Sequence, residues 1–174
     1  MDNFEDIDYW KGIVLYGLNQ ATYKIALGKT ILELADEGKE TISWDKLSKV
    51  YLDNYIERLN NNNSPQQNNP SRKTKMERIV ESFNKEVITY EKALELVNID
   101  AFNDVIPRFQ TIGTDKEIVG NKFYHFDFGK NIYLHDALFR INEENSQELK
   151  DELDARWSLL EGAFSIFTWR LAII

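Results

Sequence analysis

The chain of 174 residues carries 43% hydrophobic and 29% charged residues, which suits a single folded domain. It contains no cysteine, and this excludes a disulfide scaffold, a cysteine-ligated zinc site, an iron–sulfur cluster and a cysteine nucleophile. The net charge of −8 argues against a protein that binds nucleic acid over its whole surface, but it leaves room for a small basic site on an acidic body.

The N-terminal residues and the apolar segments predict a cytoplasmic protein. Residues 1–8 are acidic where a signal peptide would be basic. Residues 13–34 form the most apolar stretch, but Lys24, Lys29 and Glu33 interrupt it, so it cannot span a bilayer without burying charge. We therefore expect no membrane partner.

The first predicted element is one long helix from Tyr9 to about Asp36. Its apolar residues fall on two adjoining stripes, which indicates a helix that packs on more than one side. Ser43 is predicted to cap a second amphipathic helix at residues 44–60.

Residues 60–70 are rich in Asn, Gln and Pro and contain no apolar side chain, which predicts a flexible surface loop. A third helix is expected to begin near Ser71, with its apolar side chains facing inward. Thr89 is predicted to cap a short helix that ends at Val97, and another short helix should follow and stop around Pro107.

Turn glycines at positions 113, 120 and 129 separate short apolar runs and predict one small β-hairpin. Tyr124, Phe126 and Phe128 would also suit a loop at this place. A last helix is expected to start after Ser146, and its apolar residues recur at helical spacing. They are Leu149, Leu153, Trp157, Leu160 and Phe164.

The predicted fold class is mainly α. We expect a single helical-bundle domain spanning residues 1–174, with a small β-hairpin near residues 118–134. The flexible loop at 60–70 and an apolar tail at 167–174 are its two unusual segments, and the tail is expected to dock on the domain or on a partner.

The strongest basic feature lies between Ser71 and Lys85, a stretch that contains five basic residues and two acidic ones. A loop followed by a helix N-terminus with free N–H groups suits a phosphate oxygen, so this stretch is the best nucleic-acid candidate. An ordinary basic surface is an equal alternative. The side chains selected for phosphate contacts are Arg72, Lys73, Lys75 and Arg78.

A second polar group lies in the first predicted helix. Asn19 and Tyr23 are i,i+4 neighbours that can hydrogen-bond each other, and Lys24 follows directly. These three residues form a candidate second contact surface for nucleic acid. Spacing alone favours the alternative, in which they join helices of the bundle.

Acidic residues cluster between positions 143 and 154, with only Lys150 opposing them. This pattern favours a solvated helix face, and the alternative is a patch that binds a basic protein partner. The candidate partner-binding residues are Glu143, Glu144, Glu148, Asp151 and Glu152. Further along, Arg156 and Glu161 are candidates for a buried or half-buried ion pair.

The only two histidines, His125 and His135, lie ten residues apart on the predicted hairpin. A metal site would need Asp127 or Asp136 to join them as an oxygen ligand. No metalloprotease-type histidine spacing, Gly-rich phosphate loop or Gly-x-Ser-x-Gly sequence is present. We therefore expect packed or surface histidines, no metal, no cofactor and no enzyme activity.

Two segments resemble the N-terminal region of a bacterial family of HNH endonucleases. Residues from Tyr9 to Lys29 follow the pattern Tyr-Trp-x-x-Ile-x-Leu-Tyr-Gly-x-Asn-x-Ala-Thr-Tyr-Lys of its opening helix. Residues from Leu153 to Phe164 are similar to the helix that closes that region. The basic stretch and the segment 102–109 lie between them in the expected order, so the resemblance covers most of the chain.

In that family the region precedes a C-terminal HNH nuclease domain, which needs metal-ligating histidines and usually Cys-x-x-Cys pairs. This chain ends at Ile174 without a cysteine or a histidine cluster, and residues after Ser165 are apolar where the family pattern turns polar. The resemblance therefore implies a non-catalytic accessory or DNA-recognition module, with defence against foreign DNA as its context.

Two other hypotheses stay open. The net charge, the acidic run and the apolar tail favour a protein-interaction or inhibitory module that binds a basic partner or self-associates. A divalent-metal nuclease built from scattered carboxylates is the third, since any acidic chain contains the residue types it needs.

Overall fold

The computed structural model describes residues 5–15, 20–69, 71–112 and 120–172, with the backbone alone described from 167 onward. The chain is mainly helical with a small three-stranded antiparallel sheet, as the predicted fold class requires. In chain order the elements are α1 (Asp6–Leu15), α2 (Tyr23–Ala35), β1 (Thr41–Ser43), α3 (Trp44–Asn61), α4 (Lys75–Asn84), α5 (Tyr90–Leu96), the π-helix η1 (Val97–Ala101), α6 (Phe102–Arg108), β2 (Tyr124–Asp127), β3 (Asn131–Leu134) and α7 (Asp136–Ala172).

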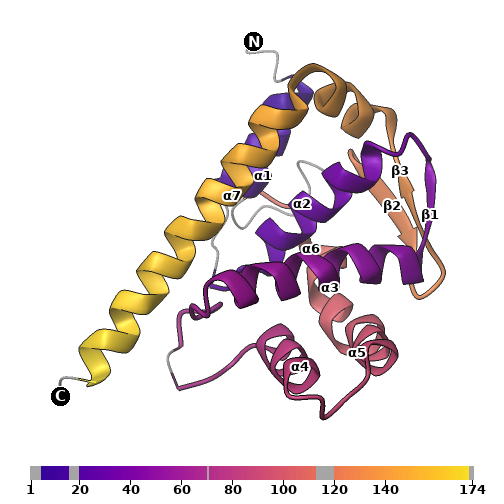
Figure 1. Ribbon diagram of the computed structural model, residues 1–174. Helices are drawn as coiled ribbons and strands as arrows, with labels where there is room; N and C mark the ends of the chain where they lie inside the picture. Colours follow the sequence, from indigo (N-terminus) through magenta and orange to yellow (C-terminus); the bar gives the residue numbers. More distant parts are fainter. Residues whose placement is uncertain (1–4, 16–19, 70, 113–119, 173–174) are drawn as a thin grey trace.

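Helix α2 lies at the centre of the molecule and packs on α7 and α3, which confirms the expectation of a helix buried on more than one side (Figure 1). Its residues Ile25, Leu27 and Ile31 are fully buried. At Gly28 the helix runs close to its neighbours, because an added Cβ would lie 3.4 Å from a methyl carbon of Leu153.

The single long helix expected from Tyr9 to Asp36 is wrong, because the structure has α1 and α2 there. Around residues 20–22 the backbone bonds to the loop after α3 instead of continuing a helix. The Thr22 amide donates to the carbonyl of Gln66 at 3.0 Å, and the Asn68 amide donates to the carbonyl of Gln20 at 2.9 Å. The loop therefore takes the hydrogen bonds that a continuous helix would have used.

The predicted hairpin is present as β2 and β3, and β3 is the middle strand because it also pairs with β1. Strand β1 was not expected from the sequence, and residues 118–119 of the predicted hairpin lie outside the described residues. Ile42 of β1 pairs with Ile132, and Tyr124 pairs with Leu134, so the buried side chains gather on one face.

Two helix starts differ from those expected. Helix α4 begins at Lys75 rather than near Ser71, because Thr74 and Glu77 form a reciprocal capping box. Helix α7 begins at Asp136 and has a non-helical residue at Asn145, so the helix expected after Ser146 is its second part. The predicted caps Ser43 and Thr89 are confirmed.

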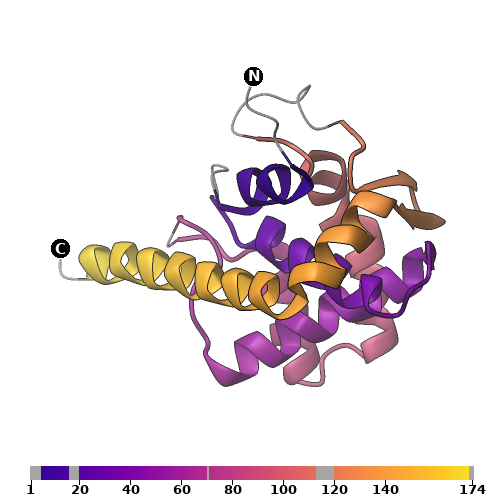
Figure 2. The same cartoon turned by 90° about the horizontal axis from the view of Figure 1, so that it is seen from above.

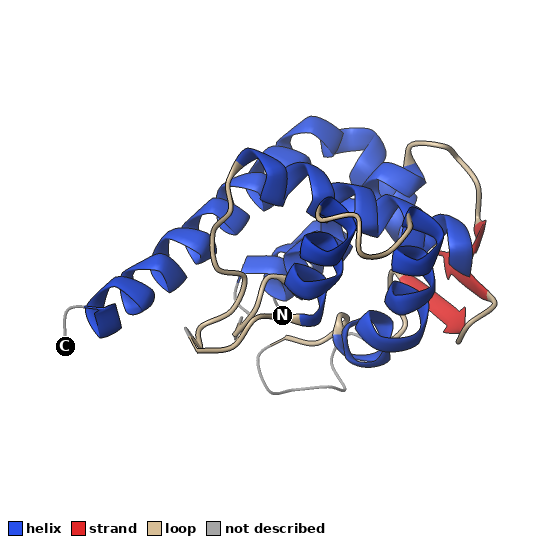
Figure 3. Ribbon diagram, turned by 60° about the horizontal axis from the view of Figure 1, so that its bottom comes forward, coloured by secondary structure: helices blue, strands red, loops and turns tan. Residues whose placement is uncertain are grey.

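The second part of α7 runs along the body and projects beyond it (Figure 2). Its far end and the sheet lie at opposite ends of the molecule (Figure 3). Leu149, Leu153, Trp157, Leu160 and Phe164 are buried, as expected for the last helix. In the described part of the chain, no helix has the length and apolar character needed to cross a membrane. The side chains of the apolar tail at 167–174 lie outside the description.

Candidate nucleic-acid interface

A groove of about 520 Å³ lies between the end of α3, the loop that follows it and α4. Its wall contains both cations and amides, the side chains that contact phosphate and sugar groups in protein–DNA complexes. The amide of Asn84 donates to the Asn60 side chain at 2.8 Å and joins the two helices at the groove. The polar lining residues are Asn60, Asn63, Ser64, Asn69, Arg72, Lys73, Glu77, Glu81, Asn84 and Lys85.

Glu81 partly neutralises the groove. Its carboxylate accepts hydrogen bonds from Lys73 at 2.6 Å and Lys85 at 2.7 Å. The hydrogen bond from Lys73, then that from Lys85, lowers the pKa of Glu81 to about 2. Glu77 is occupied in the cap of α4. The exposed Arg72 side chain has no hydrogen-bond or ion-pair partner among the described residues, so it is the free cation of this lining.

The four predicted phosphate contacts do not lie together. Arg72 and Lys73 line the groove. Lys75 reaches instead toward η1, where its Nζ atom donates to the carbonyl of Asp100 at 3.4 Å. Arg78 is exposed on α4 but is not part of the groove wall.

Tyr23 and Lys24 face inward and do not line the groove. The Tyr23 hydroxyl accepts from the Met76 amide at 3.4 Å, at the start of α4. The Lys24 ammonium donates to the Thr111 carbonyl at 2.9 Å, and burial lowers the pKa of Lys24 to about 8. Asn19 lies outside the described residues, so a shared contact surface of these three residues stays a prediction.

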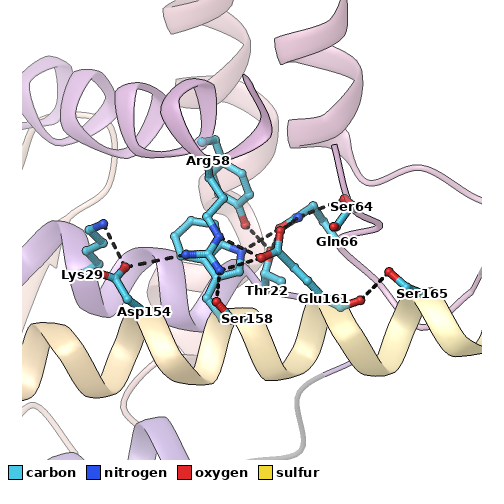
Figure 4. A network of polar contacts seen from close by, with 11 residues as sticks. Thr22, Lys29, Arg58, Ser64, Gln66, Asp154, Ser158, Glu161 and Ser165 are labelled. Atoms are coloured by element: carbon cyan, nitrogen blue, oxygen red, sulfur yellow. Dashed lines mark hydrogen bonds and ion pairs between the residues drawn. The ribbon is translucent and has the colours of Figure 1, made fainter. Parts of the chain in front are cut away.

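The loop that lines the groove is fixed to the core by a buried polar side chain, which sequence reasoning missed. Gln66 is fully buried, although its segment was predicted to be a surface loop. Its Nε2 donates to Glu161 at 2.7 Å, while its Oε1 accepts from Trp157 at 2.8 Å and Thr22 at 2.7 Å (Figure 4). No hydropathy pattern marks this residue, because its neighbours in the sequence are also polar.

Glu161 completes this buried network. Its Oε1 accepts from Arg58 of α3 at 2.8 and 2.6 Å, and the guanidinium also lies 4.8 Å from the centre of the Trp157 ring (Figure 4). The expected pair of Arg156 with Glu161 is therefore wrong. Arg156 and Glu161 are five residues apart and lie on different faces of the helix, whereas tertiary packing brings Arg58 to the carboxylate.

The acidic run of α7 lies mostly at the surface. Glu143, Glu144, Glu148 and Asp151 are exposed, whereas Glu152 is half-buried. Glu148 and Glu152 also lie 3.9 and 3.4 Å from the ammonium of Lys11 on α1, at the contact between two helices. Four of the five candidate partner-binding side chains therefore lie at the surface.

The two histidines lie together at the sheet. His125 Nδ1 is 2.6 Å from His135 Nε2. In the described ranges, no group of three or more His, Cys, Asp or Glu side chains has the arrangement of a metal site.

Comparison with known proteins identifies no relative of this chain. No family model, no curated protein and no solved structure matches it.

Proposed function

We propose that this chain is a non-catalytic module that holds the phosphate backbone of a nucleic acid in the groove beside α4. The supporting observation is the Arg72 guanidinium, which lies in a groove lined by amides and has no partner among the described residues. A guanidinium presents several N–H donors to phosphate in a fixed geometry. The resemblance to the N-terminal region of HNH endonucleases points in the same direction.

The lining favours double-stranded over single-stranded nucleic acid. Proteins that bind single strands stack bases on aromatic side chains. The groove wall contains no aromatic side chain among the described residues, so it offers phosphate contacts and amides only. We therefore expect weak sequence preference and a strong dependence on salt, as for backbone contacts in general.

The test is fluorescence anisotropy with labelled duplex and single-stranded DNA of equal length at two salt concentrations. The variant Arg72→Ala/Lys73→Ala removes both predicted contacts of the groove. Lys75→Ala/Arg78→Ala is the matched control, because it removes the same charge from adjacent positions outside the groove. We expect the groove variant to bind more weakly and to reduce the salt slope by about 1, the contact of Arg72, because Lys73 is paired with Glu81, against little change in the control.

Three other outcomes would contradict the proposal or a part of it. Equal losses in both double variants would show a diffuse basic surface instead of a groove site. No binding of wild type at low salt would reject the nucleic-acid function. Cleavage of DNA or RNA with magnesium, manganese or zinc would reject the non-catalytic part of the proposal.

A second candidate function is supported by α7. Leu159 and Ile166 are 66% and 58% exposed, lie two helical turns apart and project on one stripe of the helix. Exposed carboxylates of Glu143, Glu144 and Asp151 precede them on the same helix. This combination is complementary to a partner protein that presents a basic helix with an apolar stripe.

A synthetic amphipathic helix with a leucine stripe and lysine flanks is the probe for this second function. We expect it to bind wild type and to lose binding to Leu159→Glu/Ile166→Glu. The control is Val87→Glu, which changes an apolar side chain that is 73% exposed elsewhere on the surface. Equal binding to both variants, or equal binding of a glutamate-flanked probe, would contradict the assignment to α7.

A further inference from the structure

The outer face of the sheet brings the two histidines together. In the hairpin, His125 lies directly opposite Tyr133, and Tyr124 lies opposite Leu134. Side chains alternate between the faces of a strand, so Tyr124 and Leu134 are buried while His125 takes the other face. His135 follows Leu134, and its amide extends the ladder by donating to the Phe123 carbonyl at 2.9 Å.

The two rings meet through their nitrogen atoms. His125 Nδ1 and His135 Nε2 are 2.6 Å apart, and the His125 ring stacks on Tyr133 with a centroid distance of 4.5 Å and an angle of 12°. Two ring nitrogens cannot face each other at this distance with both lone pairs free, so one of them carries a hydrogen that it donates to the other. In the metal-free pair one ring is therefore the N–H donor and the other is the acceptor.

We propose that His125 and His135 form a binding site for a late transition-metal ion, Cu²⁺, Ni²⁺ or Zn²⁺. The ion takes the place of that hydrogen between the two facing nitrogens, and the hydrogen moves to the outer nitrogen of its own ring. Nitrogen ligands about 2.0 to 2.1 Å from an ion lie about 2.8 to 3.4 Å from each other in square-planar or tetrahedral geometry. The pair therefore needs to open by roughly 0.2 to 0.8 Å, least for a square-planar ion. Imidazole nitrogens favour these ions over Mg²⁺ and Ca²⁺, which prefer oxygen.

The surroundings allow an ion and set a modest affinity. The open polar pocket beside His135 contains Lys122 and Arg140, but both pair with Asp6, at 2.9 and 3.0 Å. Asp6 thereby compensates one of the two positive charges, and the carboxylates of Glu40 and Asp136 line the same pocket. Since no third protein ligand accompanies the pair in the described residues, water completes the coordination shell. This site is independent of the groove and of its proposed function.

Calorimetric titration of the tag-free full chain with CuSO₄, NiCl₂ and ZnCl₂ tests the proposal, with MgCl₂ and CaCl₂ as controls. The chain has two histidines in all, so every imidazole signal in its NMR spectrum belongs to this pair. We expect one equivalent to bind, with Cu²⁺ tightest, and both imidazole signals to respond to the ion. A bound ion should also raise Tm, because it binds the folded chain.

The single variants His125→Asn and His135→Asn should each bind at least about tenfold more weakly, since even outer-shell partners of ligands are worth about 10- to 100-fold in metal affinity. Asp127→Asn is the control, because it removes the carboxylate that the sequence offered as a third ligand. No third ligand accompanies the pair in the described residues, so this variant should bind like wild type. Unchanged affinity in the double histidine variant, equal binding of Mg²⁺, or no binding of any of the three ions would overturn the proposal. Circular dichroism of each variant separates loss of the site from loss of the fold.

Discussion

Glu81 determines how much positive charge the groove offers to a ligand. Its carboxylate binds both Lys73 and Lys85, so two of the cations in the lining are compensated within the protein. These are exposed pairs, and ionic contacts of this kind contribute little to folding. The consequence of Glu81 is therefore electrostatic, and it belongs to ligand binding rather than to stability.

Glu81→Gln should raise the affinity for duplex DNA several-fold, because it removes a negative charge beside the phosphates and releases Lys73 and Lys85. Anisotropy titrations at two salt concentrations measure the change, and the salt slope should become steeper. Glu86→Gln removes the same charge from an exposed position just after α4 and serves as the control. A weaker affinity for Glu81→Gln than for this control would contradict the groove.

Lys24 is a half-buried side chain whose ammonium should make the stability of the fold depend on pH. Burial lowers its pKa from 10.5 to about 8, so the folded chain binds fewer protons than the unfolded chain between these values. The free energy of unfolding should therefore rise with pH from about 8 toward 10.5. Below about pH 8 the ammonium is charged in both states, and its burial lowers the free energy of unfolding by the full amount.

The change Lys24→Met should abolish this rise. Urea unfolding at pH 7 and pH 9.5 measures the difference in the free energy of unfolding between wild type and variant, in which other titrating groups cancel. Lys39→Met, at an exposed position, is the control. A difference that stays constant between the two pH values would reject the assignment to Lys24.

At the scale of elements, the loop between α3 and α4 depends on one buried amide. Gln66 joins the loop to α7 through Glu161 and Trp157, and Asn68 joins it to residue 20 through the backbone. Arg72 and Asn69 lie on the same loop and line the groove. The shape of the groove therefore depends on the buried hydrogen bonds of Gln66 and on the backbone hydrogen bond of Asn68.

Gln66→Leu should lower the free energy of unfolding by about 2–4 kcal/mol, because it leaves Glu161 Oε2 and Trp157 Nε1 buried without this partner. Urea unfolding measures the loss. Asn68→Ala is the matched control, since its exposed side chain can be removed while its backbone hydrogen bond is kept, and it should change stability by less than about 0.5 kcal/mol. Equal losses would argue against the network.

At the scale of the whole molecule, α7 belongs both to the core and to the surface. Its break at Asn145 is bounded by contacts to the end of α2, where Asp36 accepts from Asn142 at 2.7 Å and pairs with Lys150. Farther along, Leu153 packs beside Gly28, whereas Leu159 faces solvent. One helix therefore closes the core and also presents an apolar stripe.

Leu153→Ala should lower the free energy of unfolding by about 2–5 kcal/mol, because it opens a cavity against α2. Leu159→Ala removes the same atoms from a position that is 66% exposed and should change stability by less than about 0.5 kcal/mol. Thermal or urea unfolding of the two variants compares them directly. Similar losses would show that the outer stripe of α7 is covered in solution.

Sequence patterns were enough to predict the helical class, the caps Ser43 and Thr89, the hairpin and the inward face of the last helix. Each follows from local chemistry: a hydroxyl beside a helix start, alternation along a strand, or apolar side chains at helical spacing. The sequence also identified Arg72 and Lys73 of the groove, because clustered basic charge is visible in any sequence.

The remaining features could not be predicted in this way, since they join residues that are distant in the chain. Strand β1 is too short to have a pattern of its own and exists through its pairing with β3. The break between α1 and α2 and the burial of Gln66 depend on each other, because the loop supplies the partners that hold both. Spacing along one helix cannot reveal that Glu161 belongs to Arg58, or that two surface histidines meet.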